Sequence, residues 1–443
     1  MGVMLQAFYW DCPREEQKEF LWWQHLHKQV PDLAKAGFET LWLPPVHKAA
    51  NLGGRSMGYD PYDYYDLGEF EQKGSIPTWF GSKQDLLGLI QTAHAHGMVV
   101  LADMVINHNS GADAAELNPL LNQSRWTLYQ PKSGKFPRNW ECFHPNRYER
   151  WDESTFGEFP DLSHRNPYVY GQILELARWL VEDIGFDGFR YDFVKGYGAH
   201  TVTSIQEFLY QRDGQTIIPY GVAEHWDTAQ AIEQWVNVTN FSNSNPVDAF
   251  DFPLREMLKA LCDQYGFSLY NLIYWETVLQ KQPQTTVTFV ENHDLRDPGR
   301  PIVNDKLLAY SYILTHQGYP CVFWPDYTNL ALKDTPHGIA ALLQAHNTYA
   351  GGEAQILHVD DNLYIMQRKG YAGQPGLVYV LNNRGDRWNG AWVTTQWNAV
   401  DMFPVAWWSA SDRSQPFEQR TASDGRGEFF APPRGYAVYA PRV

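Results

Sequence analysis

Carboxylate side chains end short apolar segments in four separate parts of the chain. Asp103 follows Val-Val-Leu-Ala, Asp192 follows Phe-Arg-Tyr, Glu224 follows Gly-Val-Ala, and Asp294 ends Phe-Val-Glu-Asn-His. One carboxylate at the end of a strand is most often a helix N-cap or a hydrogen-bonded structural group. Four of them in equivalent positions instead predict a shared site where acid and base groups act together.

The residues around Asp192 and Glu224 predict different charge states for the two carboxyl groups. Side chains alternate along a strand, so Arg190 and Asp192 point to the same face. A neighbouring guanidinium lowers the pKa of a carboxyl group and keeps it ionised, as a covalent nucleophile requires. Glu224 ends an apolar run before Trp226, and apolar surroundings raise the pKa of a carboxyl group, which suits a general acid. A retaining glycosidase uses such a pair, and Asp294 would stabilise its cationic transition state.

Two histidines accompany these carboxylates. His108 and His293 each follow an asparagine at the end of such a segment. A lone histidine is most often structural, but two in equivalent positions predict hydrogen bonds to sugar hydroxyl groups. His94 and His96 lie two positions apart in a predicted helix and share no face, so we interpret them as structural.

Apolar segments alternate with helical patterns over residues 1–350. Continuous apolar strands in this alternation favour a closed parallel (β/α)8 barrel over an open doubly wound sheet. Enzymes with this barrel carry their catalytic residues at the carboxyl ends of the strands, where the four carboxylates lie. The eight predicted strands are Val3–Phe8, Thr40–Leu43, Val99–Ile106, Gly188–Phe193, Pro219–Glu224, Val247–Phe250, Thr286–Val290 and Pro320–Trp324.

Two stretches interrupt the alternation. Residues 109–166 follow the third strand, are rich in Trp, Pro, Asn and Gly, and are far longer than an ordinary βα loop, which predicts an inserted domain. In residues 351–443 short apolar runs lie between Gly, Asn and Asp turns, which predicts a C-terminal antiparallel β-sandwich. Residues 1–108 and 167–350 would then form the catalytic barrel.

The composition limits the partners. Acidic residues outnumber basic ones by 51 to 35, giving a formal net charge of −16, and phosphate binding needs a basic surface, so we expect no nucleic-acid partner. No apolar run approaches a membrane span, and we expect no membrane partner. The first residues lack a signal-peptide pattern, so the protein would be cytoplasmic if the chain is complete and secreted if a leader was removed. The four cysteines form no CxxC pair, and no coiled-coil pattern occurs, so we expect buried thiols and a monomer.

Oxygen-bearing side chains flank the inserted segment. Asn107, Asp152 and Asp161 offer the hard oxygen ligands that Ca²⁺ prefers. No EF-hand spacing is present, so the residues alone favour solvated loop carboxylates.

Together the motifs resemble glycoside hydrolase family 13, the α-amylase family. The resemblance covers the barrel, the inserted domain and the C-terminal domain, and it is closest to archaeal and plant-type α-amylases. The matching segments are DMVINH at Asp103–His108, FPDLS at Phe159–Ser163, GFRYDFVKG at Gly188–Gly196, GVAEHW at Gly221–Trp226, FVENHD at Phe289–Asp294, MLQAFYWD at Met4–Asp11 and MGYDPYDYYDLGEFEQKG at Met57–Gly74.

The resemblance implies a role for each candidate site residue. It implies that Asp192 is the nucleophile, Glu224 the acid/base and Asp294 the transition-state stabiliser. It implies that Arg190 orients the nucleophile, that Tyr59 stacks on a sugar and that Asp103 is largely structural. The substrate-binding set that it implies is Tyr59, Asp103, His108, Arg190, Lys195, Trp226 and His293.

The resemblance also implies a calcium ion. Its ligands would be Asn107, Asp152 and Asp161, with backbone oxygens near Ser154 and Gly196. Archaeal relatives can place zinc beside this calcium through two histidines and a cysteine. Here His144 is kept, but Glu149 and Ser163 stand at the other two positions, so we predict no zinc.

We therefore expect an α-amylase that hydrolyses internal α-1,4-glucosidic bonds of starch, glycogen or maltooligosaccharides by a retaining double displacement. Two alternatives use the same fold. One is a relative that transfers sugars or tolerates branches on the same site. The other is a non-catalytic glucan-binding protein, which fits less well because such proteins usually lose one of the three acids. The segment after Asp294, Leu-Arg-Asp-Pro-Gly-Arg-Pro, is atypical of the family and could alter the substrate cleft.

Overall fold

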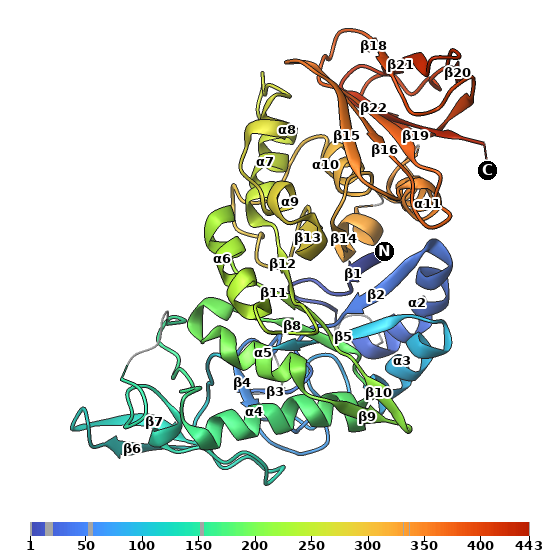
Figure 1. The fold of residues 1–443 in the computed structure, drawn as a ribbon. Coiled ribbons are helices and arrows are strands. Elements are labelled where there is room, and N and C mark those ends of the chain that lie inside the picture. Colours follow the sequence, from blue (N-terminus) through green and yellow to red (C-terminus); the bar gives the residue numbers. More distant parts are fainter. Residues whose placement is uncertain are drawn as a thin grey trace.

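A barrel, an insertion beside it and a β-rich unit at the end of the chain make up the molecule (Figure 1). The computed structural model describes residues 2–13, 21–51, 56–150, 155–330, 332–335 and 337–442. In this part of the chain, no helix is long and apolar enough to cross a membrane. The four cysteines are buried free thiols.

Eight strands close the barrel, and every neighbouring pair is parallel. They lie around it in chain order, and each overlaps one of the eight predicted segments, although β2 and β14 begin one or two residues earlier than predicted. The predicted fold class is therefore confirmed. The strands are β1 (Val3–Gln6), β2 (Phe38–Trp42), β5 (Val99–Met104), β8 (Gly188–Tyr191), β11 (Tyr220–Ala223), β12 (Asp248–Phe250), β13 (Thr286–Phe289) and β14 (Tyr319–Phe323).

Helices follow the barrel strands, and local sequence signals start several of them. The α3 helix begins with a capping box in which Ser82 and Asp85 each accept the other's backbone N–H. The first described helix begins at Trp22, just after residues 14–20, which lie outside the described residues. The helices are α2 (Trp22–Ala36), α3 (Lys83–Ala95), α4 (Pro167–Trp179), α5 (Ala199–Glu207), α6 (Ala229–Asn240), α7 (Phe252–Asp263), α8 (Asn271–Tyr274), α9 (Val278–Lys281), α10 (Lys306–Ile313) and α11 (Ile339–Tyr349).

The chain leaves the barrel between β5 and α4 to form the insertion. An antiparallel hairpin of β6 (Ala114–Asn118) and β7 (Gln123–Leu128) projects from the barrel, at the lower left in Figure 1. Partly buried polar contacts attach the insertion to the loop before α3. The Tyr62 hydroxyl donates to Asp113, and the Ser133 hydroxyl donates to Asp63 over 2.7 Å.

The C-terminal unit pairs a six-stranded antiparallel sheet with a two-stranded one. The sheet order is β15-β16-β17-β22-β19-β20, and the second sheet is β18-β21. Apolar residues from both sheets share one core, for example Ile365, Val393 and Phe429, as a sandwich requires. The strands are β15 (Ala354–Val359), β16 (Leu363–Arg368), β17 (Leu377–Asn382), β18 (Asn389–Thr394), β19 (Asp401–Ser409), β20 (Gln419–Arg420), β21 (Arg426–Ala431) and β22 (Gly435–Pro441).

Candidate active site

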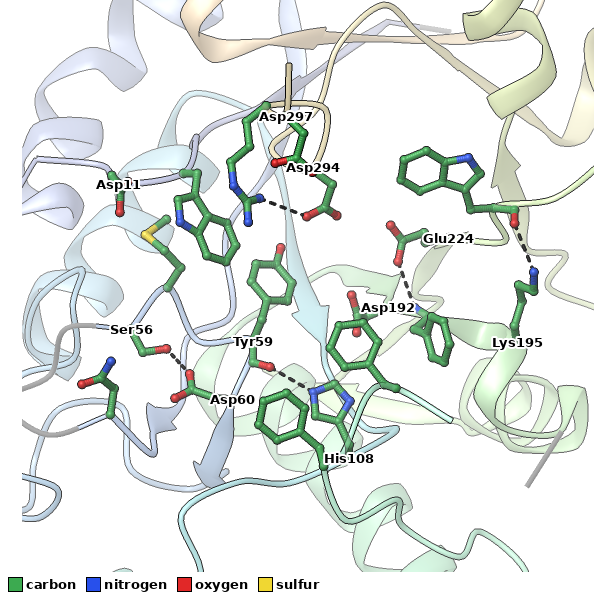
Figure 2. Close-up of a pocket in the computed structure, with 18 of the residues that line it drawn as sticks. Asp11, Ser56, Tyr59, Asp60, His108, Asp192, Lys195, Glu224, Asp294 and Asp297 are labelled. Carbon is green, nitrogen blue, oxygen red and sulfur yellow. Dashed lines mark hydrogen bonds and ion pairs between the residues drawn. The ribbon is translucent and has the colours of Figure 1, made fainter. Parts of the chain in front are cut away.

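A cavity of about 660 Å³ opens at the carboxyl ends of the barrel strands. It brings together three predicted catalytic carboxylates from different strands, and Figure 2 shows them facing one space. Other lining residues come from the loop after β1, the loop before α3 and the insertion. The lining includes Trp10, Asp11, Tyr59, Asp60, His108, Phe156, Phe159, Asp192, Lys195, Glu224, Trp226, Asp294, Arg296, Asp297 and Arg300.

Arg190 connects the carboxylates at the base of this cavity. Its strand, β8, lies between β5 and β11, and the register sets Arg190 beside Asp103 on β5. One guanidinium nitrogen, Nη1, lies 2.8 Å from Asp103 and 2.7 Å from Asp192. The other, Nη2, lies 2.9 Å from Glu224. Because one planar group contacts Asp192 and Glu224 together, these two carboxylates lie within reach of a single sugar unit.

The charge balance of this cluster differs from the one predicted for Asp192. Burial raises the pKa of Asp192 well above its usual range, and Glu224 and Asp103 add to the rise against the lowering effect of Arg190. Burial also raises the pKa of Asp103, against Arg190 and the hydrogen bond from Tyr59. The predicted lowering of the pKa of Asp192 is therefore wrong in its net direction. Three carboxylates share one cation, so the cluster binds protons as a unit.

Glu224 has polar partners instead of the apolar surroundings that the sequence predicts. One carboxylate oxygen contacts Arg190, and the other accepts the backbone N–H of Phe193 over 3.0 Å. Phe193 has a φ of 43°, in the left-handed region that non-glycine residues rarely adopt. This local backbone strain directs the Phe193 N–H at the carboxylate, and such strain is often found at functional sites.

Asp294 lies at the mouth of the cavity, where 37% of its side chain is exposed. The carboxylate lies 3.4 Å from His293 Nε2 and 3.5 Å from Arg296 Nη1. Burial raises its pKa, while Arg190 and Arg296 oppose the rise. Burial lowers the pKa of His293 well below its usual range, so this ring is neutral at neutral pH.

Stacked rings form one wall of the cavity. Tyr59 stacks on His293 with ring centroids 4.9 Å apart, and Trp10 stacks on Tyr59 at 6.0 Å. The Tyr59 hydroxyl donates to Asp103 over 2.8 Å, which holds its ring in place. Arg296 places its guanidinium 3.8 Å from the Trp10 ring centre. The sequence predicted Tyr59 and His293 here but missed Trp10, which stands in the MLQAFYWD segment.

His108 lies beneath aromatic side chains of the insertion. Its ring stacks on Phe156 at 4.5 Å and on Phe159 at 5.1 Å, and Nε2 lies 3.0 Å from the Tyr59 carbonyl oxygen. Burial lowers the pKa of His108 to about 4, so the ring is neutral. In this arrangement a sugar would meet Phe156 before His108.

Lys195 lies on the opposite side of the cavity from Tyr59 (Figure 2), and Trp226 lines the same cavity. The Lys195 ammonium lies 2.8 Å from Asp227 and donates to the Trp226 carbonyl over 3.2 Å. Arg300 covers the Trp226 ring at 5.1 Å. Arg296 and Arg300 both belong to the atypical segment after Asp294, so the departure noted in the sequence does reach the cavity.

Some of the predicted calcium ligands also converge. Asn107 donates to Asp161 over 3.0 Å, while Asn107 Oδ1 is buried without a hydrogen-bond partner. A methyl group on Gly196 would lie 2.0 Å from that oxygen. Asp152 and Ser154 lie outside the described residues. Among the residues that are described, no group of three or more His, Cys, Asp or Glu side chains could hold a metal ion.

The chain matches known α-amylases over most of its length. The family model for the catalytic domain of α-amylase matches residues 23–323. The α-amylase of Geobacillus stearothermophilus is 30% identical over 502 aligned positions, covering 100% of this chain and 87% of that protein. The cytoplasmic α-amylase of Escherichia coli strain K12 is 28% identical and covers 87% of this chain and 88% of that protein.

A solved structure shares the fold. The α-amylase from Geobacillus thermoleovorans, in complex with acarbose, superposes with a TM-score of 0.67 at 18% identity, covering 95% of this chain and 92% of that chain. The predicted family and enzyme class are thus confirmed, and these relatives favour an α-amylase over the alternatives. The chain belongs to the α-amylase family, glycoside hydrolase family 13.

Proposed function

We propose that the enzyme cleaves internal α-1,4-glucosidic bonds of starch, glycogen and maltooligosaccharides with retention of anomeric configuration. Asp192 would be the nucleophile, Glu224 the acid/base and Asp294 the stabiliser of the transition state. The observation that carries this proposal is the single guanidinium of Arg190 in contact with both Asp192 and Glu224. Retaining glycosidases need two carboxyl groups about 5 Å apart. Contact with one guanidinium keeps Asp192 and Glu224 near each other.

The first step forms a glycosyl ester. An Asp192 oxygen attacks the anomeric carbon while the bond from that carbon to the bridging oxygen breaks. The Glu224 carboxyl gives its proton to the leaving oxygen, which becomes a hydroxyl group of the released chain. Positive charge develops on the sugar ring in this step, and the Asp294 carboxylate at the mouth of the cavity would stabilise it.

The second step hydrolyses the ester. Glu224, now ionised, takes a proton from a water molecule, and the hydroxide oxygen bonds to the anomeric carbon as the bond to Asp192 breaks. Arg190 remains in contact with both carboxylates throughout, so its positive charge stabilises the negative charge on whichever of the two is ionised. The excess negative charge of the cluster favours binding of one proton, and the first step requires a proton on Glu224 and a charge on Asp192.

The walls of the cavity fit a neutral sugar chain. Trp10, Tyr59 and Trp226 offer aromatic faces for the apolar faces of sugar rings. The Lys195 ammonium in these walls can donate hydrogen bonds to hydroxyl groups, and we propose the same for the neutral His293, which lies outside the lining with Nε2 beside Asp294.

The stereochemistry of the product tests the proposal. NMR of a fresh digest of maltopentaose should show the α-anomer first, and first release of the β-anomer would reject the double displacement. The Asp192→Asn variant should lose nearly all turnover and keep the parent's circular dichroism spectrum. The matched control is Asp183→Asn, an acid outside the cavity, which should keep parental activity. Activity retained by Asp192→Asn would reject this nucleophile.

We further propose that Asn107, Asp161 and the backbone oxygen of Gly196 hold a calcium ion, with Asp152 and Ser154 completing the site. Members of this family typically depend on calcium. The buried, unpartnered Asn107 Oδ1 supports a cation at this point, because an unsatisfied oxygen there is costly. Bound calcium would supply positive charge where the insertion meets the barrel.

A glycine variant tests the calcium proposal. In Gly196→Ala the new methyl group would displace Asn107 Oδ1, so the melting temperature should fall and should lose its response to EDTA. Gly171→Ala is the control, because a methyl group there meets nothing within 4 Å. A parent whose melting temperature ignores EDTA at low calcium would contradict the calcium proposal.

A further inference from the structure

The segment after Asp294 places a guanidinium on an aromatic ring inside the catalytic cavity. Arg296 and Trp10 both line this cavity, and the Arg296 guanidinium lies 3.8 Å from the centre of the Trp10 ring. This is a van der Waals contact distance, at which the cation is attracted by the ring. The covered face of Trp10 therefore cannot hold a sugar ring while Arg296 stays in place.

The other contacts of Arg296 are few and partly open to solvent. Its Nη1 donates to the His293 carbonyl over 3.0 Å and lies 3.5 Å from the Asp294 carboxylate. The side chains of Arg296 and Asp294 are 46% and 37% exposed, and an ion pair this open contributes little. The contact with Trp10 is thus a separate interaction, and a ligand of the cavity can compete with it.

The far end of the same segment is fixed to the barrel. Arg255 donates to the Arg300 carbonyl, and the Lys259 ammonium donates to the Pro301 carbonyl over 2.7 Å. The Arg300 backbone N–H donates to the Asp297 carbonyl, which closes a turn. Because this turn is anchored, the side chain that covers Trp10 starts from a defined position at the cavity wall.

The two ends of the cavity have different roles in the proposed reaction. Glu224 protonates the leaving oxygen, so the released chain extends toward Lys195, on the far side of Glu224 from Tyr59 in Figure 2. The retained sugar units, on the nonreducing side of the cleaved bond, extend the opposite way. Trp10 stacks on Tyr59 and precedes Asp11, which lies at that opposite end. Trp10 therefore lies on the path of the retained units.

We propose that Arg296 determines chain-length specificity. By covering Trp10, it limits the number of glucose units that bind on the nonreducing side of the cleaved bond. Sugar rings bind aromatic rings through their apolar faces, so Arg296 and a glucose unit beyond Tyr59 compete for one surface. The inference rests on the proposed function, because the roles of Asp192 and Glu224 define the two sides of the cleaved bond.

Cleavage of maltoheptaose labelled at its reducing end tests this role in the full enzyme. In Arg296→Ala the uncovered Trp10 can bind one more glucose unit, so fewer units remain in the released, labelled chain. The ratio of short labelled products, glucose and maltose, to longer ones should rise by about three- to tenfold, as expected for one stacking contact. All these products come from one substrate, so their ratio does not depend on kcat, which the loss of a cation beside Asp294 can change.

Two further variants separate the cover of Trp10 from the loss of a charge. Arg300→Ala removes a cation of the same segment that lies over Trp226, at the other end of the cavity, and should not raise the ratio. Arg296→Ala combined with Trp10→Ala lacks the uncovered ring and should return the ratio to the parental value. Circular dichroism spectra check that each variant keeps the parental fold.

Three results would overturn the inference. They are an unchanged ratio in Arg296→Ala, an equal rise in Arg300→Ala, and a rise that persists when Trp10 is also replaced. The proposed function fails separately, since its failure would be a parent enzyme that does not hydrolyse maltoheptaose or that releases the β-anomer first.

Discussion

Replacing Arg190 with lysine tests whether one guanidinium organises the catalytic carboxylates. Lysine keeps the positive charge but is a single point donor, whereas arginine presents a planar fork. Arg190 uses two nitrogens to contact Asp103, Asp192 and Glu224 at 2.7–2.9 Å, and its side chain is only 1% exposed. A lysine ammonium at this position can keep one of these partners and loses the other two.

The expected loss follows from these contacts. A hydrogen bond between charged groups contributes about 1.5–3 kcal/mol, so two lost contacts weaken the orientation of the carboxylates by about 4 kcal/mol. That corresponds to a fall in kcat of about 10³-fold. The unfolding free energy should fall less, by about 1–3 kcal/mol, because a buried carboxyl group without its partner can take up a proton instead of remaining charged.

The assay measures kcat and kcat/KM on maltopentaose across pH for the parent and the variant. The free energy of unfolding of both proteins is measured beside it. Weaker pairing raises the pKa of Asp192 further, so the acid limb of the kcat/KM profile should move to higher pH. Arg178→Lys is the control, because Arg178 pairs with Glu182 at 2.8 Å on the surface and should change stability by less than about 0.5 kcal/mol. An Arg190→Lys enzyme with a kcat within a few-fold of the parent and an unmoved acid limb would refute the reasoning.

Two further predictions concern single charges. Arg296→Gln removes a cation 3.5 Å from Asp294, so the pKa of the Asp294 carboxyl should rise. The acid limb of the kcat/KM profile should then move to higher pH. An unmoved limb would show that Arg296 leaves Asp294 unaffected. Burial lowers the pKa of His316 from 6.5 to about 3, so below pH 6.5 the unfolded chain binds a proton that the folded chain does not. Acidification from pH 6.5 to 4.5 therefore costs the parent about 2 kcal/mol of stability from this group, and urea unfolding of His316→Phe should lack that loss, unlike the exposed control His96→Phe.

The sequence was sufficient to predict the barrel because most of its strands are short, largely apolar runs that alternate with helical patterns. Its prediction of the catalytic carboxylates rested on their position after such runs, and all three line one cavity. The contacts of Arg190 with other strands could not be predicted in the same way. They depend on the register of β8 with β5 and β11, which is set by packing of the whole barrel.

The errors about charge have the same origin. The neighbours of Asp192 in the chain include one arginine, which predicts a lowered pKa, but its neighbours in space include two more carboxylates, and its side chain is only 8% exposed. Glu224 follows an apolar run, yet its oxygen faces the backbone N–H of Phe193, whose left-handed φ no sequence pattern indicated. Local patterns identify ionisable groups, whereas their protonation depends on contacts between distant segments.

Sharing one cation among three acids has a chemical consequence for a double displacement. The mechanism requires a proton on Glu224 and a charge on Asp192 in the first step, whereas after that step Asp192 is an uncharged ester and Glu224 carries the charge. Separate ion pairs would fix one charge on each carboxylate, but a shared guanidinium lets charge move from Asp192 to Glu224 while its own contacts stay in place. The excess acid, Asp103, is kept in position by hydrogen bonds from Trp42 and Tyr59, so it contributes negative charge without leaving the cluster. The Asp103 charge raises the pKa of Asp192, so the cluster as a unit holds a proton more readily, and the first step requires that proton on the general acid.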